Sequence, residues 1–126
     1  MPKPGNRTNA IEIIRGETKF LEVEVKTSAG RIAKLQGAVL YMTVRKRPDA
    51  DALVVKKTGD GIEVTDASKG RALVTLNIND TNLEAGEYRY DVWVEFPAAS
   101  ENELPVRQPV ITFAPMHVED DLTDFS

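Results

Sequence analysis

Histidine and cysteine, the side chains that most often carry acid–base, nucleophilic or metal chemistry, are nearly absent from this sequence. The chain contains one histidine, His117, and no cysteine, so a histidine metal pair, a thiolate site and a disulfide are all excluded. No phosphate-binding glycine loop, Gly-x-Ser-x-Gly turn or His-Glu-x-x-His motif is present. Catalysis needs a positioned nucleophile, base or metal, so we expect a protein that is not an enzyme and has no catalytic residues.

Carboxylates are numerous in the sequence but scattered along it. Asp49 and Asp51 could contact a calcium ion, and so could the group formed by Asn77, Asn79 and Asp80. A dedicated calcium loop alternates its ligands around a glycine and ends in a distal glutamate, and neither stretch follows that pattern. We therefore expect neither a metal site nor a bound cofactor.

The residues best suited to a function are those that could contact a partner. Trp93 alternates with Val92 and Val94, which places it on the polar face of its strand together with Arg89. Tryptophan and arginine are enriched at protein interfaces. Two interpretations of Trp93 remain open: a partner covers it, or loops or a terminal strand of the same chain do.

Two stretches of opposite charge could meet between neighbouring subunits. One is a basic cluster comprising Arg45, Lys46, Arg47, Lys56 and Lys57; the other is the acidic end of the sequence, with Asp120 and Asp121. The basic cluster is either a solvated strand end or half of a complementary contact. A net charge of −4 and the lack of aromatic residues within the cluster argue against nucleic acid as the partner. The candidate partner contacts are thus Trp93, Arg89, Arg45, Arg47, Asp120 and Asp121.

Apolar residues recur with a period of two along most of the chain, and no window of 11 or more residues shows a helical stripe. Short turns rich in glycine, proline and aspartate separate these runs. Pro109 is expected at an edge or bulge, because it lacks an N–H. Many short strands with frequent turns indicate an antiparallel β-sandwich or barrel. The expected strands lie near residues 10–15, 18–26, 37–47, 52–58, 61–65, 70–78, 86–96 and 104–114.

The length of 126 residues fits one domain, and the two ends differ in charge. We expect an N-terminal tail at 1–9, a sandwich at 10–116 and an acidic C-terminal tail at 117–126. The tails are either solvated or docked on a neighbouring subunit. No apolar run is long enough for a signal peptide or a membrane span, so no membrane partner is expected.

The segment from Asp80 to Val92 carries the strongest local signal. Its Leu-x-x-Gly-x-Tyr spacing directly before a strand is typical of a tyrosine corner in a Greek-key sandwich. The glycine permits a tight bend, and the tyrosine hydroxyl can return to a backbone group a few residues upstream. We interpret these residues as structural: Asp80, Thr81, Leu83, Gly86 and Tyr88.

Over roughly residues 11–114 the sequence resembles the immunoglobulin-like domain of phage baseplate upper proteins and related tailed-phage virion proteins. The resemblance depends on the order and spacing of five short motifs: Ile13 to Phe20, Leu35 to Ala38, Gly59 to Ile62, Asp80-Thr81-x-Leu83, and Gly86 to Val92.

The resemblance implies an immunoglobulin-like antiparallel β-sandwich with a Greek key and about seven or eight strands. It also implies a structural protein of a virion that is made in the host bacterial cytoplasm. Such a protein assembles with other virion proteins into homo- or hetero-oligomers, either in the tail or baseplate or as a capsid decoration. The alternative is a carbohydrate-binding or adhesin-type immunoglobulin-like module. A glycan ligand is possible but unsupported, because sugar platforms usually present several exposed aromatic residues and this chain has eight in all.

Overall fold

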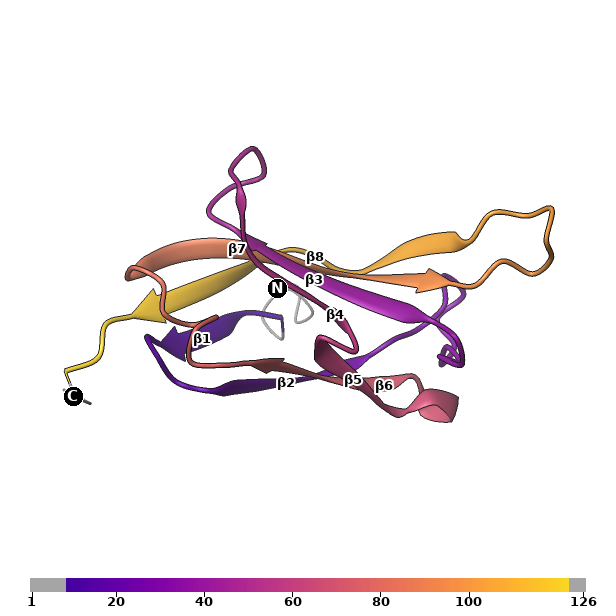
Figure 1. Ribbon diagram of the computed structural model, residues 1–126, viewed down its shortest axis with the longest axis horizontal. Helices are drawn as coiled ribbons and strands as arrows, with labels where there is room; N and C mark the ends of the chain where they lie inside the picture. The colour runs from indigo at the N-terminus through magenta and orange to yellow at the C-terminus, as the bar shows by residue number, and fades with distance from the viewer. Residues whose placement is uncertain (1–8, 123–126) are drawn as a thin grey trace, which may run out of the picture.

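Eight strands and one short 3-10 helix form a two-layered β-sandwich in the computed structural model, which describes residues 9–122 (Figure 1). None of its helices is long or apolar enough to cross a membrane within that range. In chain order the elements are β1 (Ile11–Ile14), β2 (Lys19–Glu24), β3 (Val39–Arg45), β4 (Ala52–Thr58), β5 (Gly61–Asp66), η1 (Ala67–Lys69), β6 (Arg71–Leu76), β7 (Gly86–Phe96) and β8 (Val106–Glu119).

The strand order identifies the type of sandwich. Hydrogen bonds link the strands in the order β1-β8-β7-β3-β4-β5-β6-β2, and the sheet folds so that β3, β7 and β8 face β2, β5 and β6 (Figure 1). The chain crosses between the layers after β1, β2, β4 and β6. This is the immunoglobulin-like arrangement with β4 added to the β8-β7-β3 sheet, so the predicted fold is confirmed. Two pairings are parallel, β1 with β8 and a short contact of β4 with β5, and these were not predicted.

The last strand is longer than the sequence suggested. The expected strand ended near residue 114 and the expected sandwich at 116, but β8 continues to Glu119. His117 therefore lies in the sheet, opposite Glu87 of β7 and Glu12 of β1, and not in an acidic tail. Residues 1–8 and 123–126 of the two expected tails lie outside the described residues.

The core lies between the two layers and follows the predicted alternation. Along β3, the side chains of Leu40, Met42 and Val44 are fully buried, while the residues between them point outward and are only partly exposed. On β7, the buried positions are Tyr88, Tyr90, Val92 and Val94. Trp93 consequently lies on the outer face of β7, as its spacing predicted.

The bend before β7 has the hydrogen bond expected of a tyrosine corner. The Tyr88 hydroxyl donates to the backbone carbonyl of Glu84 at 2.6 Å, and its ring is buried. The Thr81 hydroxyl donates to the carbonyl of Glu17 at 2.6 Å, which ties the bend to the turn between β1 and β2. Leu83 packs against the core from the same loop. These contacts fasten the crossover from β6 to β7.

Tyr90 occupies the position, two residues after the corner tyrosine, where antibody domains carry a cysteine of the inter-sheet disulfide. Its ring is 5% exposed, and its hydroxyl donates to the backbone carbonyl of Asn9, just before β1. A buried tyrosine thus stands at this position in a chain without cysteines. Burial raises the pKa of Tyr90 to about 12.

We expect the stability of the protein to fall between about pH 10 and pH 12 in part because of Tyr90. In the unfolded chain the phenol ionises near pH 10, whereas in the folded protein it stays neutral to about pH 12. The unfolded state therefore loses its proton first, and the free energy of unfolding decreases by at most about 1.4 kcal/mol per pH unit in this interval. Urea denaturation from pH 8 to pH 12 measures the decrease.

The test variant is Tyr90→Phe. It removes the ionising group, so its stability is expected to fall less steeply than that of the wild type above pH 10. Identical slopes for the wild type and Tyr90→Phe would contradict the assignment.

Candidate partner-binding surface

The outer face of the sheet formed by β3, β7 and β8 brings together most of the predicted contact residues. Trp93 lies directly opposite Tyr41 of β3 on one side and Pro109 of β8 on the other. Four residues further toward the start of β7, Arg89 lies directly opposite Arg45 of β3. Strand pairing thus places the predicted tryptophan and two predicted arginines on one surface.

These side chains surround a shallow hollow of about 270 Å³. Trp93 is 37% exposed and Phe113 is 56% exposed, and the Arg89 guanidinium lies 4.9 Å from the centre of the Phe113 ring. Arg47 contributes to the rim. We name Arg45, Arg89, Trp93 and Phe113, together with the space between them, the aromatic–arginine hollow.

Phe113 is the member of the hollow that the sequence did not reveal. It is the one non-glycine residue with a positive φ, +48°, in the described part of the chain. The pairing of β7 with β8 shifts register twice nearby, between Tyr90 and Trp93. Phe113 precedes the buried Ala114, so its side chain lies on the outer face. A left-handed conformation costs about 1–2 kcal/mol for such a residue, and strain of this kind gathers at functional sites.

The two arginines opposite each other give the hollow its positive charge. Like charges on directly opposed residues destabilise a sheet, and none of the ion pairs within residues 9–122 involves Arg45 or Arg89. Arg45 donates to the carbonyl of Ala50 at 2.5 Å, which holds its guanidinium in place. Arg47 pairs with Asp49 at 3.0 Å. Asp91 also lines the hollow, and its carboxylate accepts a hydrogen bond from the Trp93 indole N–H at 3.4 Å, so it offsets part of the charge of the two arginines. The remaining positive charge lets the hollow accept an anionic group beside an apolar one.

Not every predicted contact residue belongs to this surface. Asp120 lies 3.5 Å from Arg15, and Asp121 lines a separate depression with Arg15 and Ile78, so neither contacts the arginines of the hollow in its own chain. Lys56, part of the predicted basic cluster, is 9% exposed and pairs with Asp80 at 2.7 Å. The expectation that Lys56 belongs to an exposed basic patch is wrong.

His117, four residues after Phe113 on β8, pairs with two carboxylates. Its Nδ1 contacts the carboxylate of Glu87, and its Nε2 lies 3.5 Å from that of Glu119. The hydrogen bond with Glu87 raises the pKa of His117 above its usual value, despite the opposing effect of desolvation. Among residues 9–122 no group of three histidine, aspartate or glutamate side chains is arranged to hold a metal ion.

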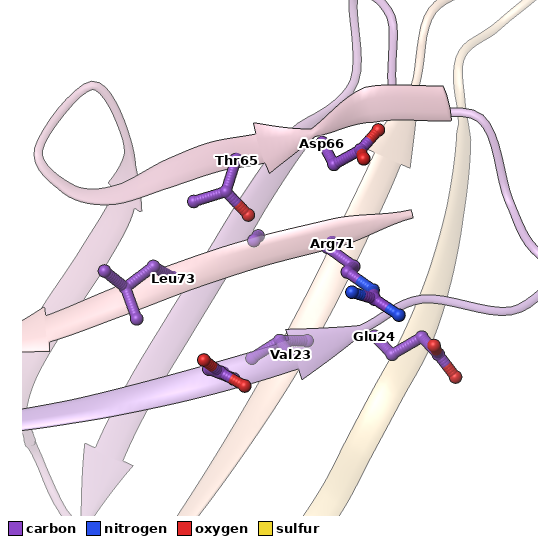
Figure 2. A pocket seen from close by; sticks show the side chains of 8 residues that line it. Val23, Glu24, Thr65, Asp66, Arg71 and Leu73 are labelled. Carbon is purple, nitrogen blue, oxygen red and sulfur yellow. The ribbon is translucent and has the colours of Figure 1, made fainter. Parts of the chain in front are cut away.

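A larger depression, of about 690 Å³, lies over the other sheet (Figure 2). Arg71 of β6 lies opposite Glu24 of β2 and opposite Asp66 of β5, so neighbours of opposite charge surround it. Asp66 also accepts hydrogen bonds from the Ser68 hydroxyl and the Lys69 N–H, which close η1. The Ser68 hydrogen bond lowers the pKa of Asp66. The acidic residues opposite Arg71 balance its charge, so this depression has no excess of positive charge like that of the hollow.

Comparison with known proteins yields matches among solved structures alone, since neither a family model nor a curated protein matches the chain. One match is a voltage-gated sodium channel β subunit studied for multimeric cell-adhesive interactions, with 14% identity over 89% of this chain and 90% of that chain, at a TM-score of 0.35. Another is the extracellular domain of the sodium channel β4 subunit, solved as parallel homodimers and discussed for cell–cell adhesion. It has 15% identity over 90% of this chain and 92% of that chain, at a TM-score of 0.32.

Proposed function

We propose that this protein is a non-enzymatic immunoglobulin-like module that binds a protein partner through the aromatic–arginine hollow. The observation that carries the proposal is the exposure of Trp93 and Phe113 beside two arginines that have no acidic partner within residues 9–122. Aromatic and arginine side chains dominate the binding energy of protein interfaces. The strained backbone at Phe113 supports a functional role for this surface.

We further propose that the partner is another subunit of a tailed-phage particle, in the tail or baseplate or on the capsid. The order and spacing of the motifs between Ile13 and Val92 support this assignment. In this role the sandwich is a rigid body made in the bacterial cytoplasm, and assembly depends on complementary surfaces. Mass spectrometry of particles purified by density gradient tests the assignment directly, because absence of the polypeptide from mature particles contradicts it.

Trp93→Ala is expected to reduce incorporation into particles at least tenfold, because it removes the largest exposed aromatic side chain from the hollow. Phe20→Ala is the matched control. Phe20 is 61% exposed on β2, in the opposite layer, so its removal is expected to leave incorporation unchanged. Circular dichroism and urea denaturation verify that both variants fold. Equal incorporation of Trp93→Ala and the wild type would show that the hollow is not part of the assembly contact.

The alternative is an adhesin-type module whose ligand is a glycan. The exposed rings of Trp93 and Phe113 favour it, because sugars stack on aromatic faces, and Arg45 and Arg89 would suit a carboxylate-bearing sugar. Binding of the wild type, but not of Trp93→Ala, to acidic glycans on an array would favour this alternative over a virion subunit.

A further inference from the structure

We propose that the aromatic–arginine hollow binds the acidic segment 119–122 of a second copy of this chain. The segment consists of Glu119, Asp120, Asp121 and Leu122. This inference rests on the proposed function of the hollow as a protein-binding surface, and it specifies the occupant.

Charge complementarity is the first argument. The hollow contains two arginines directly opposite each other, Arg45 and Arg89, with no ion pair to either among residues 9–122. The one carboxylate that lines the hollow, Asp91, accepts the Trp93 indole N–H, so the two arginines leave the hollow positively charged. The segment offers three consecutive carboxylates, of which Glu119 lies 3.5 Å from His117 and Asp120 lies 3.5 Å from Arg15 in their own chain, while Asp121 is in none of the ion pairs of residues 9–122. Bringing carboxylates between the two guanidinium groups would relieve their mutual repulsion and form charge-assisted hydrogen bonds.

Apolar complementarity is the second argument. Leu122 is fully exposed, and it directly follows the three acidic residues. In the hollow, the exposed rings of Trp93 and Phe113 lie beside the arginines, with the Arg89 guanidinium over the Phe113 ring. A segment with acidic groups next to one leucine therefore matches a surface with arginines next to two aromatic rings.

Shape favours a projecting segment over a flat face. The hollow is concave, and the outer face of the opposite layer, which also carries acidic residues, is hollowed too. Two concave surfaces cannot pack closely against each other, whereas an extended segment can enter a hollow of about 270 Å³. This geometry selects segment 119–122 over the acidic outer face of β2, β5 and β6.

The geometry of the chain points to a second copy and not to its own segment. Val118 lies opposite Gly86, and the hollow begins at Arg89, three residues further along β7, and extends to Trp93, seven residues further, roughly 10 Å and 23 Å at about 3.3 Å per residue. The segment leaves β8 away from the middle of β7 (Figure 1), and Asp120 contacts Arg15. That contact spans 3.5 Å between exposed side chains, so it is weak and easily exchanged.

The test uses Trp93 as a reporter, because it is the only tryptophan in the chain. The receptor is the triple variant Asp120→Asn, Asp121→Asn and Leu122→Ser, whose own segment cannot compete. An amidated peptide of residues 117–122 is expected to shift the Trp93 emission on binding. The same peptide with Asp120→Asn and Asp121→Asn is expected to bind at least tenfold more weakly. Binding of the acidic peptide is also expected to weaken in 0.5 M salt.

Sedimentation equilibrium then measures self-association of the full chain. The wild type is expected to associate in a concentration-dependent way, and the triple variant and Arg89→Glu are each expected to lower the association constant at least tenfold. The triple variant mixed with Arg89→Glu is expected to form a heterodimer, because one chain supplies the hollow and the other supplies the segment. Phe20→Ala is the control and is expected to associate like the wild type.

The outcomes separate this inference from the proposed function. If Trp93→Ala and Arg89→Glu abolish partner binding while the triple variant associates like the wild type, the occupant is different and this inference is wrong. If the peptide leaves Trp93 emission unchanged at millimolar concentration, or an acidic glycan shifts it while the peptide does not, the inference is also overturned. If hollow variants leave every association unchanged, the proposed function itself fails.

Discussion

Asp80→Ala is expected to lower the free energy of unfolding by about 3–5 kcal/mol, because it leaves a buried lysine charge without a partner. The Nζ atom of Lys56 lies 2.7 Å from Oδ2 of Asp80, and their side chains are only 10% and 15% exposed. The same carboxylate oxygen accepts a hydrogen bond from the backbone N–H of Asn77 at 2.8 Å. The substitution removes both contacts and leaves the buried Lys56 charge without a partner.

Two further variants distinguish an unpaired charge from a general loosening of the loop. Lys56→Met removes the lysine charge, so adding it to Asp80→Ala is expected to restore part of the lost stability, with a favourable coupling in a double-mutant cycle. Asp49→Ala is the surface control. Asp49 pairs with Arg47 at 3.0 Å, but its side chain is 80% exposed, so its loss is expected to cost less than about 1 kcal/mol. Urea denaturation at pH 7 measures the wild type, the three variants of the cycle and Asp49→Ala, and equal effects of Asp80→Ala and Asp49→Ala would contradict the prediction.

The importance of this ion pair could not be predicted from the sequence. Asp80 was assigned to a local turn, where it does accept the N–H of Asn77, but its partner Lys56 comes from a strand 24 positions earlier. Which strands lie side by side decides such a contact, and periodicity within one segment carries no information on that. Lys56 was instead grouped with neighbouring basic residues, most of which are exposed.

Local patterns predicted most of the fold, since alternation depends on each strand alone. The alternation correctly placed Tyr88 and Tyr90 in the core and Trp93 on the outer face of β7. The same alternation continues to the end of β8, where Met116 and Val118 are buried, although the expected strand ended near residue 114. Pro115 is tolerated within the strand opposite Arg89.

The candidate site was predictable only in part, for a related reason. Trp93 and Arg89 belong to one strand, so their shared face follows from their spacing. Arg45 joins them because β3 pairs with β7 in a particular register, and Phe113 joins them because β8 pairs with β7 so that its ring lies beside Arg89. The pairing between strands decides both contacts, and alternation within one segment carries no information on it.

Gly70→Ala is expected to destabilise the protein by about 4 kcal/mol or more, or to prevent folding, because the methyl group has no space. Gly70 ends η1 with φ of +67°, a conformation that costs an alanine about 1–2 kcal/mol by itself. A Cβ atom there would lie 2.7 Å from the carbonyl oxygen of Val25 and 2.8 Å from that of Ala33. Both obstacles are backbone atoms, so neither can rotate away.

The matched control is Gly59→Ala, since Gly59 has φ of +88° but no atom within 4 Å of the added carbon. It is expected to cost only the conformational penalty of about 1–2 kcal/mol, so the difference between the two variants isolates the steric clash. The Gly70 carbonyl accepts the N–H of Val25 at 2.7 Å, and the Val25 carbonyl accepts the N–H of Ala33 at 3.0 Å. A displaced Gly70 would therefore break the junction between the β5–β6 turn and the loop leading to β3. Thermal and urea unfolding measure the stability of both variants. Equal losses of stability would show that the backbone around Gly70 moves to make space for the methyl group.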